Sequence, residues 1–287
     1  VGQYLYAPVH SIFEAKWKEL SKRIKNLVGS LSEEEHIVAS FVLDNPNQEI
    51  TTFTKNGLVK RSVFKDYVVS RYTKAMSAFK LKEGDYVVSV ERTTSRTLMV
   101  SANGYYVNID SSEIPTVGPR ASGVKGIALK DDHLIGGYSI DSTHEYLTLI
   151  TNNKTAKRIK ISELETHNRA KKGSSLIKKV KSFDYQITKC LLTTARDEVC
   201  IKADSEIKIL KNSEIPIMDM KSTGSNISNI DDAFLPFIKL SYLDKKKEDT
   251  NVVKEEPKPV EETPKEDIPV VKLEQSSLDE FFDEFKF

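Results

Sequence analysis

Short runs in which apolar and polar residues alternate recur along most of the chain. These runs are rich in β-branched and aromatic residues, a pattern typical of strands that bury one face. Within residues 1–243, only the segment SIFEAKWKELSKRIKNLV at 11–28 has helical spacing. The pattern therefore predicts an all-β chain. The predicted strands are HIVASFVL (36–43), ITTFT (50–54), DYVVSVE (85–91), TLMVS (97–101), YLTLIT (146–151), ITKCLLT (187–193) and EVCIKA (198–203).

Between these runs, a turn followed by an alternating strand occurs five times. The copies are GQYLYAPVHSI (2–12), TKNGLVKRSVFKDY (54–67), SANGYYVNIDSSEI (101–114), TNNKTAKRIKISEL (151–164) and KADSEIKILKNSEI (202–215). The turn residues, at positions 2, 57, 104, 154 and 205, are 55, 47, 50 and 51 residues apart. A period of about 50 residues with several strands suits the blades of a propeller-like fold. The first copy lacks a preceding strand, so we expect a truncated first blade and a sequence that is a fragment.

Charge divides the chain into two parts. Residues 244–287 carry 8 Lys and 14 Asp or Glu, a net charge of −6, whereas residues 1–243 carry a net charge of +7. Residues 244–271 are rich in Pro, Glu and Lys and poor in aromatic residues, so we expect a disordered charged linker. Residues 272–287 place Leu278, Phe281, Phe282 and Phe285 at helical spacing. A short amphipathic helix and a frayed terminus remain alternative interpretations of this segment.

No catalytic pattern is present in the sequence. It has no phosphate-binding or dinucleotide-binding glycine motif and no nucleophile elbow, and neither its five histidines nor its two cysteines have metal-ligand spacing. Cys190 and Cys200 flank LLTTARDEV, which predicts a hairpin that turns near Ala195. No apolar run approaches the roughly 18 residues of a membrane helix, and no export signal is seen. We therefore expect a cytosolic chain with reduced thiols and no metal.

Lysines and arginines recur at equivalent positions of successive repeats. Because blades follow one another around a ring, such positions fall on one rim, where fixed cations suit a curved polyanion. A solvated surface is the alternative interpretation. The candidate DNA-binding residues are Lys60, Arg61, Arg71, Lys74, Arg120, Lys125, Lys157, Arg158, Arg169, Lys171, Lys172, Lys178 and Lys179, with Lys181, Lys208 and Lys211 continuing the pattern.

Glycines accompany these cations in GPRASGVKG (118–126) and KKG (171–173). Glycine admits positive φ and a close approach of the backbone to another surface. We expect Gly118, Gly123, Gly126 and Gly173 to form rim loops that approach phosphate. The fifth repeat replaces this loop by MDMKSTGSN and keeps only Lys221, so DNA contact should weaken in the last blade.

Three of these segments together resemble a known family. NGLVKRS, GPRASGVKGIALK and RAKKGSSLIKKVKS, spaced about one blade apart, look like the C-terminal β-pinwheel domain of type IIA topoisomerases, found in the A subunits of gyrase and topoisomerase IV. The resemblance covers roughly residues 1–243. GQYLYAPVHSI with KWKELSKRI, and SRYTKAMSAFKLKEGD, are similar to the topoisomerase IV protein of Gram-positive bacteria. Gyrase A proteins carry a Gln-Arg-Arg-Gly-Gly-Lys-Gly box in the first blade, and nothing in this sequence matches it. Because we expect the sequence to start within a truncated first blade, the gyrase A protein remains an alternative.

The resemblance implies a fold, a role and partners. The fold is a β-pinwheel, in which blades exchange a strand with their neighbours. The role is to bind and bend double-stranded DNA and to present it to a cleavage core for ATP-dependent decatenation and relaxation during chromosome segregation. The nucleophilic tyrosine, Mg²⁺ and ATP belong to other domains or to the B subunit of topoisomerase IV, and a second copy of the A subunit binds through the region upstream. The location is the cytoplasm, at the nucleoid.

Three alternatives and one regulatory hypothesis accompany this assignment. The domain can instead be a gyrase wrapping domain, a propeller-like scaffold for proteins, or a propeller enzyme, for which the repeats indicate no central cluster of acids or metal ligands. The acidic tail is expected to compete with DNA for the cations, because tethered opposite charges meet at high effective concentration.

Overall fold

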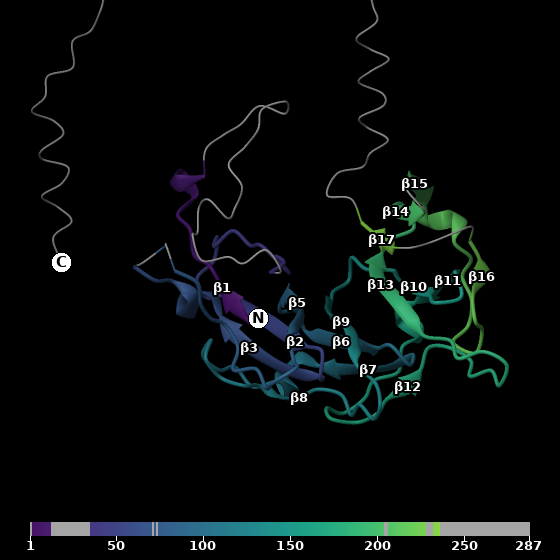
Figure 1. Cartoon of the computed structure of the whole chain (residues 1–287), viewed down its shortest axis with the longest axis horizontal. Coiled ribbons are helices and arrows are strands. Elements are labelled where there is room, and N and C mark those ends of the chain that lie inside the picture. Colours follow the sequence, from purple (N-terminus) through teal and green to yellow (C-terminus); the bar gives the residue numbers. More distant parts are fainter. Residues whose placement is uncertain are drawn as a thin grey trace, which may run out of the picture. The chain divides into compact units, whose positions relative to one another are not determined.

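The computed structural model describes residues 2–12, 35–70, 72, 74–203, 206–227 and 232–235. The described strands belong to one unit that ends at Asp244. The predicted helix at 11–28 lies almost wholly outside the described residues. The predicted linker at 244–271 and the terminal segment at 272–287 also lie outside them. Figure 1 shows the described strands grouped into small antiparallel sheets that follow one another along the chain.

Each complete sheet, which we call a blade, takes three strands from one repeat and a fourth from the next. Blade II consists of β2 (Glu49–Thr54), β3 (Leu58–Val63), β5 (Val87–Arg92) and β8 (Val124–Lys125), in the order β5-β2-β3-β8. The donated strand β8 comes after the first two strands of blade III, and it pairs with the start of β3. The strand exchange predicted from the family resemblance is therefore present.

Blades III and IV repeat this arrangement. Blade III has the order β9-β6-β7-β12, and blade IV has the order β13-β10-β11-β16. Their strands are β6 (Arg96–Ser101), β7 (Tyr105–Asp110), β9 (Leu134–Ile140), β12 (Ser174–Ser175), β10 (Tyr146–Thr151), β11 (Thr155–Lys160), β13 (Ile187–Thr193) and β16 (Ser225–Asn226).

Among the described residues, the first and last blades contain fewer strands. In blade I, β1 (Gln3–Tyr4) pairs with the donated strand β4 (Met76–Ser77). Blade V has the order β15-β14-β17 and contains β14 (Glu198–Ala203), β15 (Glu206–Lys211) and β17 (Asp232–Phe234). In each repeat a 3₁₀ helix follows the alternating strand after the turn, which we call the signature strand. These helices are η1 (Val9–Ser11), η2 (Phe64–Tyr67), η3 (Ser111–Glu113), η4 (Ile161–Glu163) and η5 (Asn212–Glu214).

The hydrophobic core lies mainly between successive blades. Phe53 and Val59 of blade II pack with Met99, Val107 and Ile109 of blade III, and all five side chains are buried. Similar clusters join blade III to blade IV and blade IV to blade V. Because each blade buries its apolar face against its neighbour, the repeats stabilise one another.

The prediction of an all-β repeat is confirmed, with three local errors. Residues 36–43 form no strand, and the side chains of Ile37 and Val42 are largely exposed. Strand β9 has the sequence LIGGYSI, whose two glycines gave no strand pattern. At Gly137 an added Cβ would lie 2.2 Å from the Phe53 ring, so the glycine permits the close packing of β9 against blade II.

The hairpin predicted between Cys190 and Cys200 is also wrong. Cys190 lies on β13, which pairs with β10 in blade IV, whereas Cys200 lies on β14 in blade V. Both thiols are free and buried, and burial raises the pKa of each. The residues between them connect two blades, because β13 is the last strand that this repeat contributes to blade IV and β14 is the first strand of blade V.

Candidate nucleic-acid interface

A loop crosses from each repeat to the preceding blade and ends in the donated strand. We call these segments crossover loops; they span 115–125, 165–175 and 216–226. In blade II the backbone N–H of Arg61 donates to the Pro115 carbonyl (3.1 Å), and the Val117 N–H donates to the Arg61 carbonyl (2.9 Å). The loop then continues along β3, so that Lys125 pairs with Leu58. Each crossover loop therefore covers the outer strand of the preceding blade.

Neighbouring crossover loops are hydrogen-bonded to one another. The Ala170 N–H donates to the Gly126 carbonyl (2.7 Å), and the Arg169 guanidinium donates to the Lys125 carbonyl (2.8 Å). Farther along the chain, the Lys178 N–H donates to the Ser222 carbonyl (3.4 Å). Equivalent loops from successive repeats therefore form one continuous edge of the described unit.

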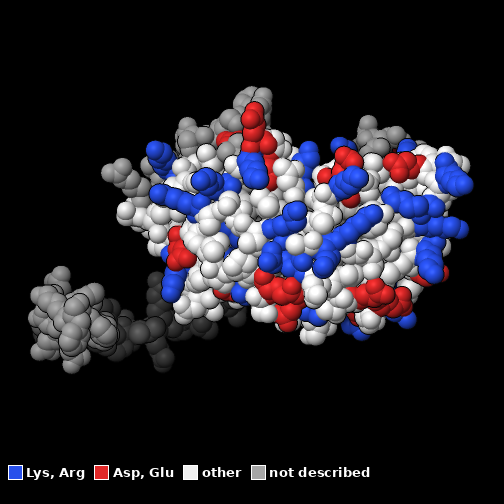
Figure 2. All heavy atoms as spheres, turned by 90° about the horizontal axis from the view of Figure 1, so that it is seen from below, with Lys and Arg blue, Asp and Glu red and all other residues white. Residues whose placement is uncertain are grey.

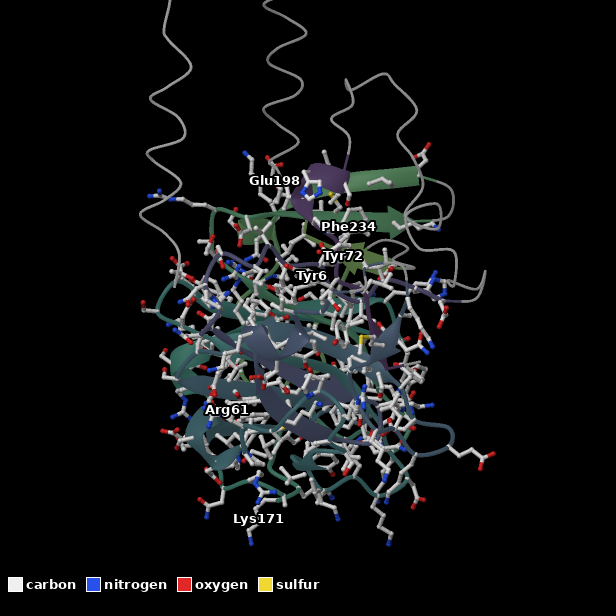
Figure 3. The ribbon with its side chains drawn as sticks, turned by 90° about the vertical axis from the view of Figure 1, so that its left-hand side faces the viewer. Tyr6, Arg61, Tyr72, Lys171, Glu198 and Phe234 are labelled. Atoms are coloured by element: carbon white, nitrogen blue, oxygen red, sulfur yellow. The ribbon has the colours of Figure 1, made fainter. Side chains whose placement is uncertain are left out.

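Exposed cations of two successive repeats lie on this edge. Figure 2 shows the face at the bottom of Figure 1, where Lys and Arg form a band with carboxylates gathered mostly at its margins. Lys171 lies at the lower limit of the described chain in Figure 3. We call the following set the cationic edge; all its members are exposed except Arg169, which is half-buried: Arg120, Lys125, Arg169, Lys171, Lys172, Lys178 and Lys179.

An aromatic side chain that the sequence reasoning missed lies within the cationic edge. The Lys172 ammonium lies 4.1 Å from the centroid of the Tyr105 ring, and the Lys179 ammonium lies 5.7 Å from it. Tyr105 is the first residue of β7 and directly follows the turn glycine Gly104. The sequence places Tyr105 directly after the turn glycine. It does not show that two lysines about 70 residues later contact the ring, because the crossover loop brings them there.

Two lysines predicted to contact DNA are instead buried. Lys60 is fully buried, and its ammonium donates to the carbonyls of Gly118 (3.0 Å) and Pro119. Lys157 occupies the equivalent position in blade IV and donates to the carbonyls of Asp219 (2.8 Å) and Ser222 (2.9 Å). Burial lowers the pKa of each lysine to about 8. Both residues hold a crossover loop and are not available to phosphate, so the prediction is wrong for Lys60 and Lys157.

The neighbouring arginines, Arg61 and Arg158, also bind carbonyl groups of the segment that covers the strand. The Arg158 side chain is buried, and it donates to the Ile215 carbonyl (2.6 Å) and lies 4.6 Å from the Tyr146 ring centroid. Arg61 donates to the Ile114 carbonyl (2.8 Å) and forms an ion pair with Glu49 (3.1 Å). The DNA-binding role predicted for Arg158 is therefore wrong, and the guanidinium of Arg61 is already engaged within the protein.

The loop glycines serve the strand exchange. Gly123 and Gly173 have positive φ, and an added Cβ would lie 2.7 Å from the Val59 carbonyl oxygen and 1.7 Å from the Tyr106 carbonyl oxygen, respectively. At Gly126, an added Cβ would lie 2.4 Å from the Met99 sulfur. These three glycines thus approach the preceding blade; the turn predicted at Gly123 is present, while Gly126 is buried, so its predicted approach to DNA is wrong. An added Cβ at Gly118 would meet no atom within 4 Å.

The remaining predicted residues lie in different settings. Lys74 and Lys181 are exposed, and Arg71 lies outside the described residues. Lys208 and Lys211 are exposed on β15 of blade V. The turn position that the fourth repeat fills with Lys154 has a φ of +58°, in line with Gly57 and Gly104 in the other copies.

Across the described part of the chain, no cluster of three or more His, Cys, Asp or Glu side chains is placed to hold a metal ion. Within the same ranges, no helix is both long and apolar enough to cross a bilayer.

Comparison with known proteins identifies the repeat. The family model of the DNA gyrase C-terminal domain, described as a β-propeller, matches residues 48–94, 97–139 and 145–182, which correspond to blades II to IV. A solved C-terminal domain of DNA topoisomerase IV superposes with a TM-score of 0.78 at 29% identity, over 87% of this chain and 81% of the other. Blades II to IV therefore belong to this family of gyrase C-terminal domains, and the chain is similar to the topoisomerase IV domain.

Two similar curated proteins are named as A subunits of DNA topoisomerase 4. The A subunit of DNA topoisomerase 4 from Bacillus subtilis is 30% identical over 229 residues, which is 78% of this chain and 28% of the relative. The Staphylococcus aureus protein of the same name is 27% identical over 80% of this chain and 29% of its own length. The chain thus spans less than a third of these relatives. A gyrase A C-terminal domain shares the fold, with a TM-score of 0.65 at 18% identity over 82% of this chain and 77% of the other.

Proposed function

We propose that this domain binds and bends double-stranded DNA for a type IIA topoisomerase and takes no part in bond cleavage. The cationic edge carries the proposal: it draws exposed Lys and Arg side chains from successive repeats onto one continuous surface. Phosphate neutralisation releases counterions and gives affinity without sequence preference. The curated relatives are named as A subunits of DNA topoisomerase 4, which supports the same role.

Bending requires contacts along an extended surface. Bending 20–30 base pairs by 40–90° costs on the order of 1–6 kcal/mol, so one basic loop is not enough. On this surface Lys125 comes from one repeat and Lys171 and Lys178 come from the next, and the two crossover loops are hydrogen-bonded to each other. The domain would in this way hold a curved duplex and present it to the cleavage core of the intact enzyme.

The finer assignment is the A subunit of topoisomerase IV. Its support is the 30% identity to the Bacillus subtilis protein, against 18% to the gyrase A domain. In that setting the intact protein would pair with a second copy of itself and with the B subunit of the same enzyme. ATP and Mg²⁺ would be bound outside this chain during decatenation and relaxation at the nucleoid.

Fluorescence anisotropy with a labelled duplex of arbitrary sequence across a salt series tests the proposal. Affinity should fall steeply with salt. The double variant Lys171→Gln/Lys172→Gln should bind more weakly and reduce the slope of log K against log salt by about 1 to 2, because each lost phosphate contact removes about 0.9.

Lys189→Gln is the matched control. Lys189 lies on β13, at the opposite sheet edge from the donated strand, in a partly exposed ion pair with Asp232 (3.3 Å). Its removal should leave the slope unchanged. Binding that does not respond to salt, or equal losses in both variants, would favour the scaffold interpretation.

A further inference from the structure

Within the part of the chain that the structure describes, blade V ends in an open strand edge. In blades II, III and IV the second hairpin strand is covered on its outer side by a donated strand, whereas β15 pairs only with β14 among the described strands. Figure 1 shows β15 at the outer end of its sheet, beyond β14. Ile207 is 62% exposed and Ile209 is 43% exposed on this strand. An exposed apolar edge with unpaired backbone groups is a template for another strand.

In blades II and IV an Ile-Pro segment begins to cover this edge. Ile114 and Ile215 are fully buried, and the residue that follows each of them accepts a backbone hydrogen bond from an arginine of the covered strand. In blade IV the Arg158 N–H donates to the Pro216 carbonyl (2.9 Å), and the Met218 N–H donates to the Arg158 carbonyl (3.0 Å). The segment runs parallel to the strand at this point.

The sequence contains Ile-Pro a third time, in the acidic tail. Glu-Ile-Pro occurs at 113–115 and 214–216, and Asp-Ile-Pro occurs at 267–269. In all three places two further apolar or β-branched residues follow: Thr-Val, Ile-Met and Val-Val. The first two copies cover the edges of blades II and IV, and blade V is the blade whose corresponding edge is open among the described strands.

Blade V also presents the residue that would clamp such a segment. By strand position Lys208 is equivalent to Lys60 and Lys157, whose ammonium groups bind the carbonyl four residues after the buried isoleucine. Lys208 is exposed, and Lys211 adds a second cation to the same strand. Asp267 precedes the isoleucine of the tail segment, as Glu113 and Glu214 precede the isoleucines of the other two copies.

We propose that residues 266–271 of this chain dock on β15 and complete blade V as a donated segment. Thirty residues separate Leu235 from Glu266. A flexible chain of that length has an r.m.s. span of about 30 Å, while β15 lies two strand spacings, about 10 Å, from β17. In the register of blades II and IV, this docking would pair the Ile209 N–H with the Pro269 carbonyl and the Val271 N–H with the Ile209 carbonyl, and the Lys208 ammonium would bind the Lys272 carbonyl.

Amide hydrogen exchange of the full chain, resolved at Ile209, tests the proposal without DNA. Ile268→Asp places a charge where an isoleucine would be buried, and it should speed exchange at Ile209 about tenfold relative to the unmodified chain. Val260→Asp adds the same charge to the tail outside the Ile-Pro segment and should leave that rate unchanged. Unaltered exchange in β14 checks that the blade stays folded in both variants.

Two outcomes would overturn the proposal. One is an Ile209 amide that exchanges at the same rate in the unmodified chain and in the Ile268→Asp variant. The other is protection that grows with protein concentration, since it would assign the edge to a second copy of the chain. Neither readout depends on DNA binding, so the proposed function stands or falls separately.

Discussion

The ammonium nitrogen of Lys60 lies 3.0 Å from the carbonyl oxygen of Gly118, a residue of the following repeat. Lys157 repeats this relationship with Asp219 at 2.8 Å. A charged group is thus buried at two blade junctions and satisfied by loop carbonyls. The basic residues of the signature strands hold the repeats together, and the loops that they hold carry the exposed cations.

Lys60→Ala should lower the free energy of unfolding by about 2–4 kcal/mol, because it leaves a cavity beside Phe79 and removes the bonds to the crossover loop. Lys125→Ala is the matched control, since Lys125 is exposed on the strand that the loop forms. That change should stay within about 0.5 kcal/mol. Equal effects in urea unfolding would contradict the clamp assigned to Lys60.

The two buried lysines predict a pH dependence of stability. Burial lowers the pKa of each from 10.5 to about 8 in the folded chain. Between pH 8 and 10.5 the unfolded chain therefore binds more protons, and the free energy of unfolding should rise with pH across this window. A Lys60→Met/Lys157→Met variant should lose this rise. The prediction fails if unfolding curves of both proteins shift equally with pH.

Gly173→Ala should destabilise the domain much more than Gly84→Ala. Both glycines have a φ near +75°, but an added Cβ meets no atom within 4 Å at Gly84 and lies 1.7 Å from the Tyr106 carbonyl oxygen at Gly173. The left-handed conformation alone costs about 1–2 kcal/mol. Thermal unfolding measures how much further the melting temperature falls in Gly173→Ala than in Gly84→Ala. Equal melting temperatures would show that the crossover loop does not require this glycine.

Tyr105→Leu should weaken duplex binding about two- to fivefold, because the ring holds the Lys172 and Lys179 ammonium groups at the cationic edge. An exposed cation–π contact contributes about 0.5–1 kcal/mol. Tyr105→Phe keeps the ring and should keep the affinity. Anisotropy at one fixed salt concentration compares the three proteins, and a loss in the Phe variant equal to that in the Leu variant would assign the effect to the hydroxyl group.

Deletion of residues 244–287 should tighten duplex binding at low salt, because the tail carries a net charge of −6 on the same chain as the cationic edge. The gain should shrink as salt is added and screens the competition. The dissociation constant at fixed low salt is the measurement. An unchanged value would remove the tail as a competitor.

Periodic features of the fold were predictable from the sequence, and contacts between repeats were not. The alternation in ITTFT and YLTLIT predicted β2 and β10 because such strands bury one face of a sheet. In contrast, Lys60 and Lys125 look alike in sequence. Their burial differs because a loop almost sixty residues downstream folds over Lys60, and only the topology of the strand exchange fixes which residue is covered.

The same limit applies to glycine and cysteine. Gly137 weakens the strand pattern of β9, although its missing side chain is what lets β9 pack against the Phe53 ring. Cys190 and Cys200 flank a turn-like segment that connects two blades. Local sequence preferences predict the same strand-turn-strand pattern for a hairpin and for a connection between two blades. Only the pairing of each strand with distant strands distinguishes the two.

The backward donation of strands has a consequence for synthesis. A chain emerging from the ribosome has made β3 by Val63, yet the strand that completes that blade, β8, ends at Lys125. Each blade must therefore wait about sixty residues with one edge unpaired, and at 5–20 residues per second that interval is several seconds. During translation the nascent domain always exposes one unfinished blade to aggregation or to chaperones, and only the arrival of the next repeat ends that exposure.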